Sequence, residues 1–223
     1  MKNKIVIVNS NPIHKRIVEK CKADFKAITI LEQKKLTPEF LKKIKPHYIF
    51  FLHWSYIIPK EIWSKHNCIV FHMTDLPFGR GGSPLQNLVT RKYSETKISA
   101  LKVEAGIDTG KIYLKKKLSL LGTAEEIFLR VGDILYNMIH EIILYKMEPK
   151  SQKGKVTLFK RRAPKESNIS DLSDLNSVFD FIRMLDADGY PKAFIETAHL
   201  RFEFSRASLK VNGIIADVKI TTK

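Results

Sequence analysis

The sequence predicts an α/β protein with a Rossmann-like, open, mostly parallel twisted sheet and a small, mostly β C-terminal domain. Up to about residue 150, short apolar segments alternate with helical segments, and strands that are apolar throughout are typical of a parallel sheet covered on both faces. Residues 148–155, EPKSQKGK, are polar and contain Pro and Gly, as linkers do. Beyond them, an Asn212-Gly213 dipeptide between alternating segments is a strong hairpin signal. We therefore expect one domain over 1–150 and another over 151–223.

The individual elements follow from the apolar pattern and from capping residues. Thr37 and Pro38 suit the cap and the first residue of a helix, and TAEE at 123–126 forms a capping box. The predicted strands of the first domain are 4–9, 25–30, 47–54, 68–73, 98–105 and an edge strand at 111–120. The predicted helices are 11–21, 37–44, 59–66, 83–93 and 123–147. In the second domain we expect a strand at 156–162, a helix around 177–187 and hairpin strands at 201–211 and 214–220.

Composition and charge narrow the class of protein. The formal net charge is +16, from 39 Lys and Arg against 23 Asp and Glu, which favours anionic partners such as RNA or a nucleotide but also fits a solvated lysine surface. Two cysteines without a CxxC pair argue against a disulfide framework and a cysteine-built zinc site, so no metal is expected. The chain lacks the pattern of a signal peptide and any apolar run near the roughly 20 residues of a spanning helix. These features predict a cytoplasmic protein without a membrane partner.

Two polar residues follow neighbouring predicted strands. His72 ends the strand CIVFHM and opens a glycine-rich loop that continues to Pro84, while Asp108 lies in GIDTGKI after the next strand. Ligands of open parallel sheets bind beyond the carboxyl ends of the strands, so we expect both side chains at one crevice. An imidazole beside a carboxylate suits proton transfer near neutral pH. The chain contains no GxGxxG or Walker sequence, which argues against a dinucleotide or P-loop site.

These residues resemble a known family. The pattern H-x-[ST]-x-L-P-x-x-R-G-x-x-P over His72–Pro84, with G-x-D-T-G from Gly106, is similar to the folate-dependent formyltransferases. This family includes methionyl-tRNA, phosphoribosylglycinamide and nucleotide-sugar formyltransferases. RRAPKESNIS (161–170) resembles its C-terminal domain, and FDFIRMLDADGYPKAF (179–194) resembles the sugar branch, with the formyltransferase of the pseudaminic acid pathway as the nearest likeness.

The resemblance implies a formyltransferase core and formyl transfer from 10-formyltetrahydrofolate to a primary amine. It assigns catalysis to His72 and Asp108. Its folate-binding positions map onto Trp54, Tyr56, Ile57, Thr74, Asp75, Leu76, Pro77, Glu104 and Ala105.

One position departs from the family. The family carries an asparagine two residues before the histidine, where this chain has Val70. A donor to the developing oxyanion is worth about 10²–10³ in rate, so another group must contribute or the enzyme is slow. The candidates are a backbone N–H and the side chains of His53, Asn87, Gln86 and Asn9. A catalytically inactive descendant is the other interpretation.

The remaining polar residues indicate what kind of acceptor the chain could bind. Arg80, Arg161 and Lys192 could bind an anionic acceptor or serve the fold, and Ser83 and Gln86 border the same loop. The sequence favours small-molecule substrates, namely the folate and a nucleotide-linked amino sugar of the UDP-4-amino-deoxyhexose type used for surface glycans or flagellin. It argues against nucleic acid as a partner and leaves a homodimer open. The alternatives are methionyl-tRNA as acceptor, or a basic nucleic-acid-binding protein without catalysis.

Overall fold

The computed structural model describes residues 4–223, so the first three residues of the predicted 1–150 domain lie outside the described part. The chain forms two compact units, and neither is a continuous stretch of sequence. Unit 1 comprises Met1–Arg80, Thr96–Leu118 and Phe128–Leu158. Unit 2 comprises Gly81–Glu95, Ser119–Ile127 and Phe159–Lys223.

The main sheet has six strands in the order β2-β1-β3-β4-β6-β7. Its strands are β1 (Ile5–Asn9), β2 (Ile28–Ile30), β3 (Tyr48–Leu52), β4 (Cys68–His72), β6 (Glu95–Lys102) and β7 (Ile112–Ser119). The first four are parallel, whereas β6 runs antiparallel to β4, with His72 opposite Ser99. The predicted mostly parallel sheet and the edge position of β7 are confirmed.

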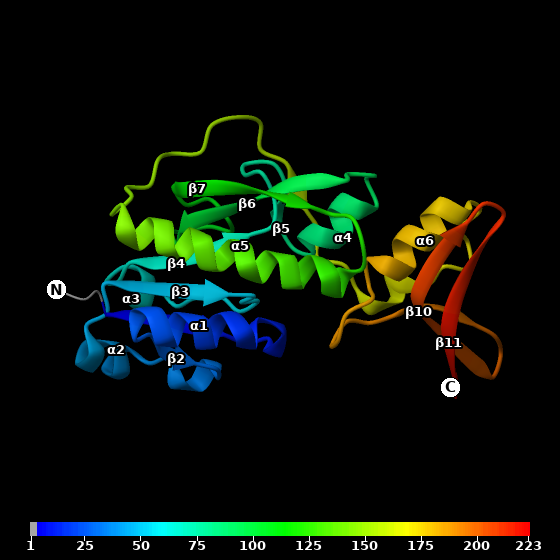
Figure 1. Ribbon diagram of the computed structural model, residues 1–223, viewed down its shortest axis with the longest axis horizontal. Helices are drawn as coiled ribbons and strands as arrows, with labels where there is room; N and C mark the ends of the chain where they lie inside the picture. The colour runs from blue at the N-terminus through cyan, green and yellow to red at the C-terminus, as the bar shows by residue number, and fades with distance from the viewer. Residues whose placement is uncertain (1–3) are drawn as a thin grey trace. The chain divides into compact units, whose positions relative to one another are not determined.

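Helices cover both faces of these strands (Figure 1). They are α1 (Lys15–Phe25), which follows the 3-10 turn η1 (Pro12–His14), α2 (Pro38–Ile44), α3 (Lys60–Trp63) and α5 (Ala124–Leu144); η2 (Gln33–Lys35) is a further 3-10 turn. On one face Val6, Val8, Ile49 and Phe51 pack with Leu41 of α2 and Ile62 of α3. On the other face α1 and α5 meet at Gly132, where an added Cβ would lie 3.0 Å from the Ile17 side chain. The alternation of strand residues explains why each strand is apolar throughout.

The long helix begins where its capping box predicts. The backbone N–H of Glu126 donates to Thr123 Oγ1 over 3.2 Å, and the Glu126 carboxylate accepts from the Thr123 N–H over 2.7 Å. These reciprocal bonds satisfy two of the donors that a helix start leaves unpaired. The predicted apolar stripe is buried: Ile127, Val131, Leu135, Met138 and Ile142.

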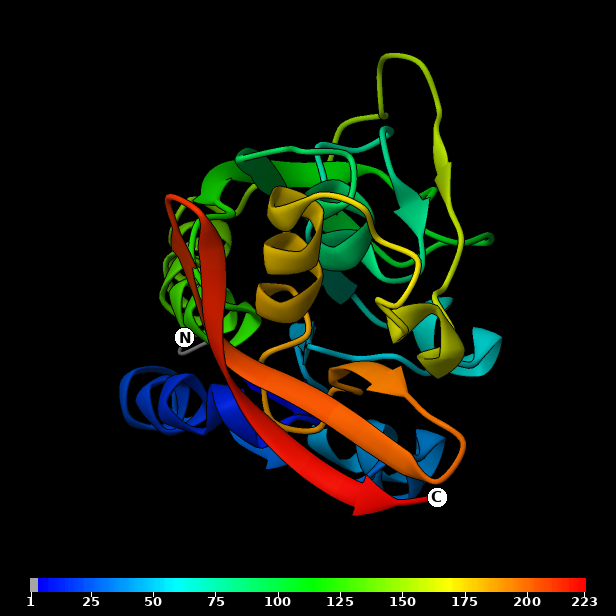
Figure 2. The same cartoon turned by 90° about the vertical axis from the view of Figure 1, so that its right-hand side faces the viewer.

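Unit 2 contains a three-stranded antiparallel sheet in the order β11-β10-β9, with α6 beside β10 (Figure 2). Its elements are β9 (Ala193–Glu196), β10 (Leu200–Lys210), β11 (Gly213–Thr222), α4 (Pro84–Val89), α6 (Leu175–Arg183) and the 3-10 turn η3 (Pro164–Ser167). The hairpin predicted at Asn212-Gly213 is confirmed, since Lys210 pairs with Gly213.

Two expectations for the C-terminal part need correction. The sequence predicted a strand over 156–162, but only β8 (Leu158–Phe159) forms, paired with the equally short β5 (Arg80–Gly81). Strand β9 was not predicted, because it has only four residues and begins two positions after Pro191. Propensity signals are weakest for such short strands, whose pairing with β10 decides their conformation.

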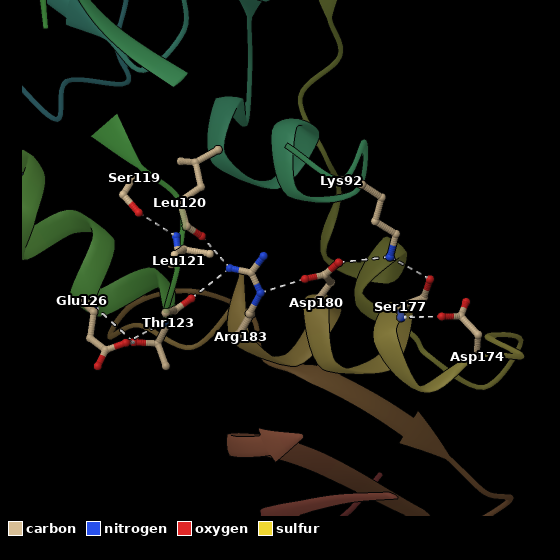
Figure 3. A network of polar contacts seen from close by, with 11 residues as sticks. Lys92, Ser119, Leu120, Leu121, Thr123, Glu126, Asp174, Ser177, Asp180 and Arg183 are labelled. Atoms are coloured by element: carbon tan, nitrogen blue, oxygen red, sulfur yellow. Dashed lines mark hydrogen bonds and ion pairs between the residues drawn. The ribbon is translucent and has the colours of Figure 1, made fainter. Parts of the chain in front are cut away.

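The buried Arg183 at the end of α6 ties three separate segments of unit 2 together (Figure 3). Its Nη1 donates to the carbonyls of Leu120 at 2.7 Å and Gly122 at 3.0 Å, and its Nε lies 2.7 Å from the Asp180 carboxylate. Asp180 also accepts from Lys92 Nζ at 3.0 Å. A buried guanidinium is tolerated only when its donors are matched by acceptors, as they are here. The network explains why 81–95 and 119–127 group with the C-terminal residues.

Among the described residues, no helix combines the length and the apolar character needed to cross a lipid bilayer.

We predict that Arg183→Ala lowers the free energy of unfolding by about 3 kcal/mol, because it leaves Asp180 Oδ1 and two buried carbonyls without the donor that Arg183 supplies. Urea unfolding measures the change. Arg16→Ala is the control, since that side chain is 82% exposed and its carboxylate partner is 3.9 Å away. A loss for Arg183→Ala no larger than that for Arg16→Ala would contradict the assigned role.

Candidate active site

His72 is the last residue of β4 and is 8% exposed. Its Nε2 lies 2.7 Å from the carbonyl oxygen of Gly79, which is in the loop that follows the strand. A carbonyl oxygen can only accept, so Nε2 carries the proton in this contact. Gly79 has a φ of 76°, a conformation that glycine adopts without steric cost and that turns its carbonyl toward the ring. The loop thus fixes the plane of the imidazole.

The other ring nitrogen faces a carboxylate. His72 Nδ1 lies 3.5 Å from Asp108 Oδ2, and both side chains are more than four-fifths buried. The predicted pair therefore exists in unit 1. A carboxylate at this position stabilises the ring when both nitrogens are protonated and the ring is positively charged, because Nδ1–H can then donate to it.

The pair forms by a different route from the one that the sequence predicted. Asp108 was expected beside His72 because both residues would follow parallel strands. β6 is antiparallel, however, and its end at Lys102 lies opposite Ile69, at the other end of β4 from His72. The loop of residues 103–111 returns toward His72 instead. The expectation of proximity was right and the reason for it was wrong.

The loop that carries Asp108 has a demanding backbone. Asp108 adopts a φ of 52°, in the left-handed region that Asp and Asn enter more readily than most residues. At Gly110 an added Cβ would lie 1.8 Å from the carbonyl oxygen of Lys102, so only glycine fits there. The second glycine of the G-x-D-T-G motif, Gly110, is therefore required for steric reasons.

Gln152 joins this loop to Arg80, and sequence reasoning missed it. Its Nε2 donates to the carbonyls of Asp108 at 2.7 Å and Gly110 at 2.8 Å. Its Oε1 accepts from Arg80 Nη2 at 2.8 Å and Nε at 3.2 Å. Gln152 lies in the segment 148–155 that was interpreted as a linker, and a single polar residue in such a segment gives no signal of a tertiary role.

The predicted folate loop lies directly after His72. Thr74 and Leu76 are fully buried, and the peptide bond from Leu76 to Pro77 is cis. Thr74 Oγ1 donates to the Gly79 carbonyl at 3.3 Å. Ser99 of β6 donates to the Thr74 carbonyl at 2.7 Å. This loop is therefore held from two sides.

Asp75 in this loop is paired with two lysines. Its carboxylate contacts Lys115 of β7 and lies 2.9 Å from Lys97. Burial favours the neutral acid, but the bonds from the two ammonium groups outweigh it and lower the pKa of Asp75. Lys115 Nζ also donates to the Leu76 carbonyl, so one side chain of the edge strand braces the loop.

The remaining folate positions are more dispersed. Trp54 and Ile57 line a cavity of about 330 Å³, together with Leu36, Ile58, Pro59, Gln33 and Lys34. The indole Nε1 of Trp54 is buried without a hydrogen-bond acceptor among the described residues. Tyr56 is half exposed and packs edge-on to Trp54 at 5.1 Å, and Ala105 is exposed. Glu104, Tyr56 and Ala105 do not line this cavity, and a folate role for the whole set stays a prediction.

Val70, in the family's asparagine position, packs against the apolar cluster of unit 1. Asn9 and His53 are the candidates in unit 1 for the missing oxyanion donor. Asn9 Nδ2 donates to the Asn11 carbonyl at 2.9 Å. Burial lowers the pKa of His53, and burial together with His53 lowers the pKa of His14 to about 4. Both imidazoles are thus neutral at pH 7.

The candidate oxyanion donors in unit 2, Asn87 and Gln86, already form hydrogen bonds within the fold. Asn87 Nδ2 contacts the carbonyls of Gly82, Ser83 and Lys160, and its Oδ1 accepts from Arg91. Gln86 is buried, and its Nε2 donates to the Met184 carbonyl at 3.1 Å.

The predicted acceptor-binding residues differ in how far the fold already uses them. Arg161 is exposed. Ser83 Oγ accepts from the backbone N–H of Arg162 at 3.0 Å. Lys192 Nζ lies 2.8 Å from the Asp186 carboxylate, and Arg80 is held by Gln152 as described above. Binding of an acceptor by these residues and by Gln86 stays a prediction.

Comparison with known proteins agrees with this geometry. Residues 164–221 match the family described as "Methionyl-tRNA formyltransferase, C-terminal domain". The solved structure titled "Methionyl-tRNA formyltransferase from Clostridium thermocellum" is 50% identical, with a TM-score of 0.96 over 99% of this chain and 100% of that chain. The chain belongs to the folate-dependent formyltransferase family.

Two further comparisons show how the similarity is distributed within this family. The methionyl-tRNA formyltransferase of Prochlorococcus marinus is 27% identical over 186 residues, which are 81% of this chain and 52% of the relative. The chain thus spans about half the length of the curated relatives it matches. A sugar N-formyltransferase from Shewanella sp. FDAARGOS_354 shares the fold, with 15% identity, a TM-score of 0.68 and coverage of 89% of this chain and 94% of that one.

We predict that Lys115→Met weakens the acid dependence of stability. The folded-state pKa of Asp75 is lowered, so its contribution is fully present above the unfolded pKa and is lost as the pH falls through the folded one. Without Lys115 this contribution shrinks, and the loss of unfolding free energy between about pH 6 and pH 3 becomes smaller than in the wild type.

Urea unfolding at the two pH values measures the difference. Lys117→Met on the same strand is the matched control, because Lys117 is exposed. An equal acid dependence in Lys115→Met and the wild type would show that the contact with Asp75 does not stabilise the folded state.

Proposed function

We propose that this chain transfers a formyl group from 10-formyltetrahydrofolate to the primary amine of methionyl-tRNA. The observation that carries the chemistry is the nearly buried His72–Asp108 pair, with its atoms 3.5 Å apart. The choice of acceptor is supported by the relative of 50% identity, which is described as a methionyl-tRNA formyltransferase.

The reaction makes a clear demand on a protein. The amine nitrogen attacks the formyl carbon, the carbonyl oxygen becomes an oxyanion, and the bond from that carbon to the folate nitrogen then breaks. The amine loses a proton and the folate nitrogen gains one. An imidazole next to a carboxylate meets both demands, since it can stabilise the oxyanion as a cation and exchange a proton near neutral pH.

Nε2 is the edge of His72 that would serve the substrates, because Nδ1 faces Asp108. Its present acceptor is the carbonyl of Gly79, 2.7 Å away. A reacting oxygen or nitrogen must therefore replace that carbonyl as the partner of Nε2.

Residues 179–194, whose sequence resembles the sugar branch, stabilise the fold of unit 2. Within residues 179–194, Arg183 holds two backbone carbonyls and Lys192 pairs with Asp186. Asp186 also accepts from the backbone N–H of Arg206 at 2.7 Å. Because these charges neutralise one another within the fold, the motif gives little support to Lys192 as a ligand of an anionic acceptor. The net charge of +16 is compatible with a polyanionic acceptor.

The second candidate acceptor is a nucleotide-linked amino sugar. It is favoured by the sequence likeness of residues 179–194 to the sugar branch and by the exposed Arg161, whose guanidinium suits a phosphate. An amino sugar of the pseudaminic acid pathway is the more specific form of this second candidate.

The acceptor is tested by incubating the chain with 10-formyltetrahydrofolate and either methionyl-tRNA or a UDP-4-amino sugar. We expect formylmethionyl-tRNA, with an affinity for tRNA that falls steeply with salt because many phosphates are contacted. Formylation of the sugar alone, with a shallow salt dependence, would establish the second candidate instead.

We predict that His72→Ala and Asp108→Asn each lower kcat by about 10²–10⁴-fold with whichever acceptor is formylated. The double variant should be little worse than either single one, because the two groups act as a unit. Single-turnover rates measure this effect. Lys117→Met, which changes an exposed side chain of unit 1, serves as the control, and a His72→Ala variant as fast as that control would refute the assignment.

A further inference from the structure

The amide of Gln152 can adopt only one orientation in its site. Two backbone carbonyls face one side of it and the guanidinium of Arg80 faces the other. Carbonyls only accept and a guanidinium only donates, so the NH₂ group must point to the carbonyls and the oxygen to Arg80. Both N–H donors and both lone pairs of the amide are used. Such full satisfaction is what distinguishes a built contact from an incidental one.

The backbone around Gln152 is held at two points. On one side Lys150 exchanges two backbone hydrogen bonds with Ile112 of β7, at 2.8 and 2.9 Å. On the other side the Thr157 carbonyl accepts from the N–H groups of Gly79 at 3.0 Å and Arg80 at 2.9 Å. Residues 150–157 therefore form a strap, anchored to the edge strand and to the loop after His72. Gln152 is the side chain of this strap that reaches the Asp108 loop.

These contacts close a ring of interactions within unit 1. His72 Nε2 contacts the Gly79 carbonyl, and the residue after Gly79 is Arg80. Arg80 donates to Gln152, Gln152 donates to the carbonyl of Asp108, and the Asp108 carboxylate faces His72 Nδ1. Each member limits the freedom of the next. A change at Gln152 opens the ring without altering the side chain of either His72 or Asp108.

We infer that Gln152 is a positioning residue for formyl transfer, which sets the place of the Asp108 carboxylate by holding the backbone of the same residue. The inference rests on the function proposed above. Asp108 sits at a φ of 52°, which is costly for a residue with a side chain unless its surroundings hold it. Without the two N–H bonds, the loop of residues 103–111 can relax and the carboxylate can move away from the ring. Displacements of about 1 Å in an active site can cost about 10²-fold in rate.

Two substitutions at the same position separate the two halves of the amide. Gln152→Ala removes both halves. Gln152→Glu keeps an acceptor for Arg80 but presents a carboxylate oxygen to the carbonyls of Asp108 and Gly110. We expect both variants to lose about 10- to 100-fold in kcat, with KM for the folate changed by less than about twofold. Full activity in Gln152→Glu would show that only the Arg80 contact matters and would overturn the inference.

A double-variant comparison tests whether Gln152 acts through Asp108. In an Asp108→Ala background, the further change Gln152→Ala should leave kcat unaltered, since there is no carboxylate left to position. An equally large second loss would show a role independent of Asp108 and would contradict the inference. Lys153→Ala, at an exposed neighbour in the strap, is the control and should behave like the wild type.

An NMR measurement that needs no enzymatic turnover keeps this test separate from the test of the proposed function. The ring signals of His72 in a carbon–proton NMR spectrum are identified by their disappearance in His72→Ala. We expect them to shift in Gln152→Ala and to stay in place in Lys153→Ala. Unmoved His72 signals in Gln152→Ala would overturn the inference whether or not any acceptor is formylated.

Discussion

The contact between His72 Nε2 and the carbonyl of Gly79 is the constraint on which the rest of the candidate site depends. It commits the proton of the neutral ring to Nε2 and leaves Nδ1 facing the Asp108 carboxylate. The loop that supplies the carbonyl is held in turn by Ser99 of β6, by Lys115 of β7 and by the strap of residues 150–157. These contacts hold the imidazole of His72 in one orientation at the end of its strand.

Two of these supports come from the last two strands of the main sheet, the antiparallel β6 and the edge strand β7. The antiparallel β6 presents Ser99 to the backbone of Thr74, and β7 brings Lys115 to Asp75 and Leu76. The antiparallel strand β6 and the edge strand β7 thus both hold the loop that follows His72.

The sequence predicts those features that depend on local pattern. Apolar strands, the Thr37 cap, the Thr123–Glu126 capping box and the Asn212-Gly213 hairpin all form, because each depends on residues a few positions apart. His72 and Asp108 were found from a motif. The direction of β6, strand β9 and the role of Gln152 could not be predicted, because each is decided by a partner distant in sequence. Lys192 was predicted as a possible acceptor ligand, because its partner Asp186 becomes visible only in the folded chain.

The central claim is that Nε2 of His72 exchanges the Gly79 carbonyl for the formyl group of the folate. A crystal structure of the chain with a stable 10-formyl folate analogue tests it most directly. The account predicts the formyl oxygen within about 3 Å of His72 Nε2, with Nδ1 still facing Asp108. An analogue bound with its formyl group away from His72, while Nε2 stays on the Gly79 carbonyl, would contradict it.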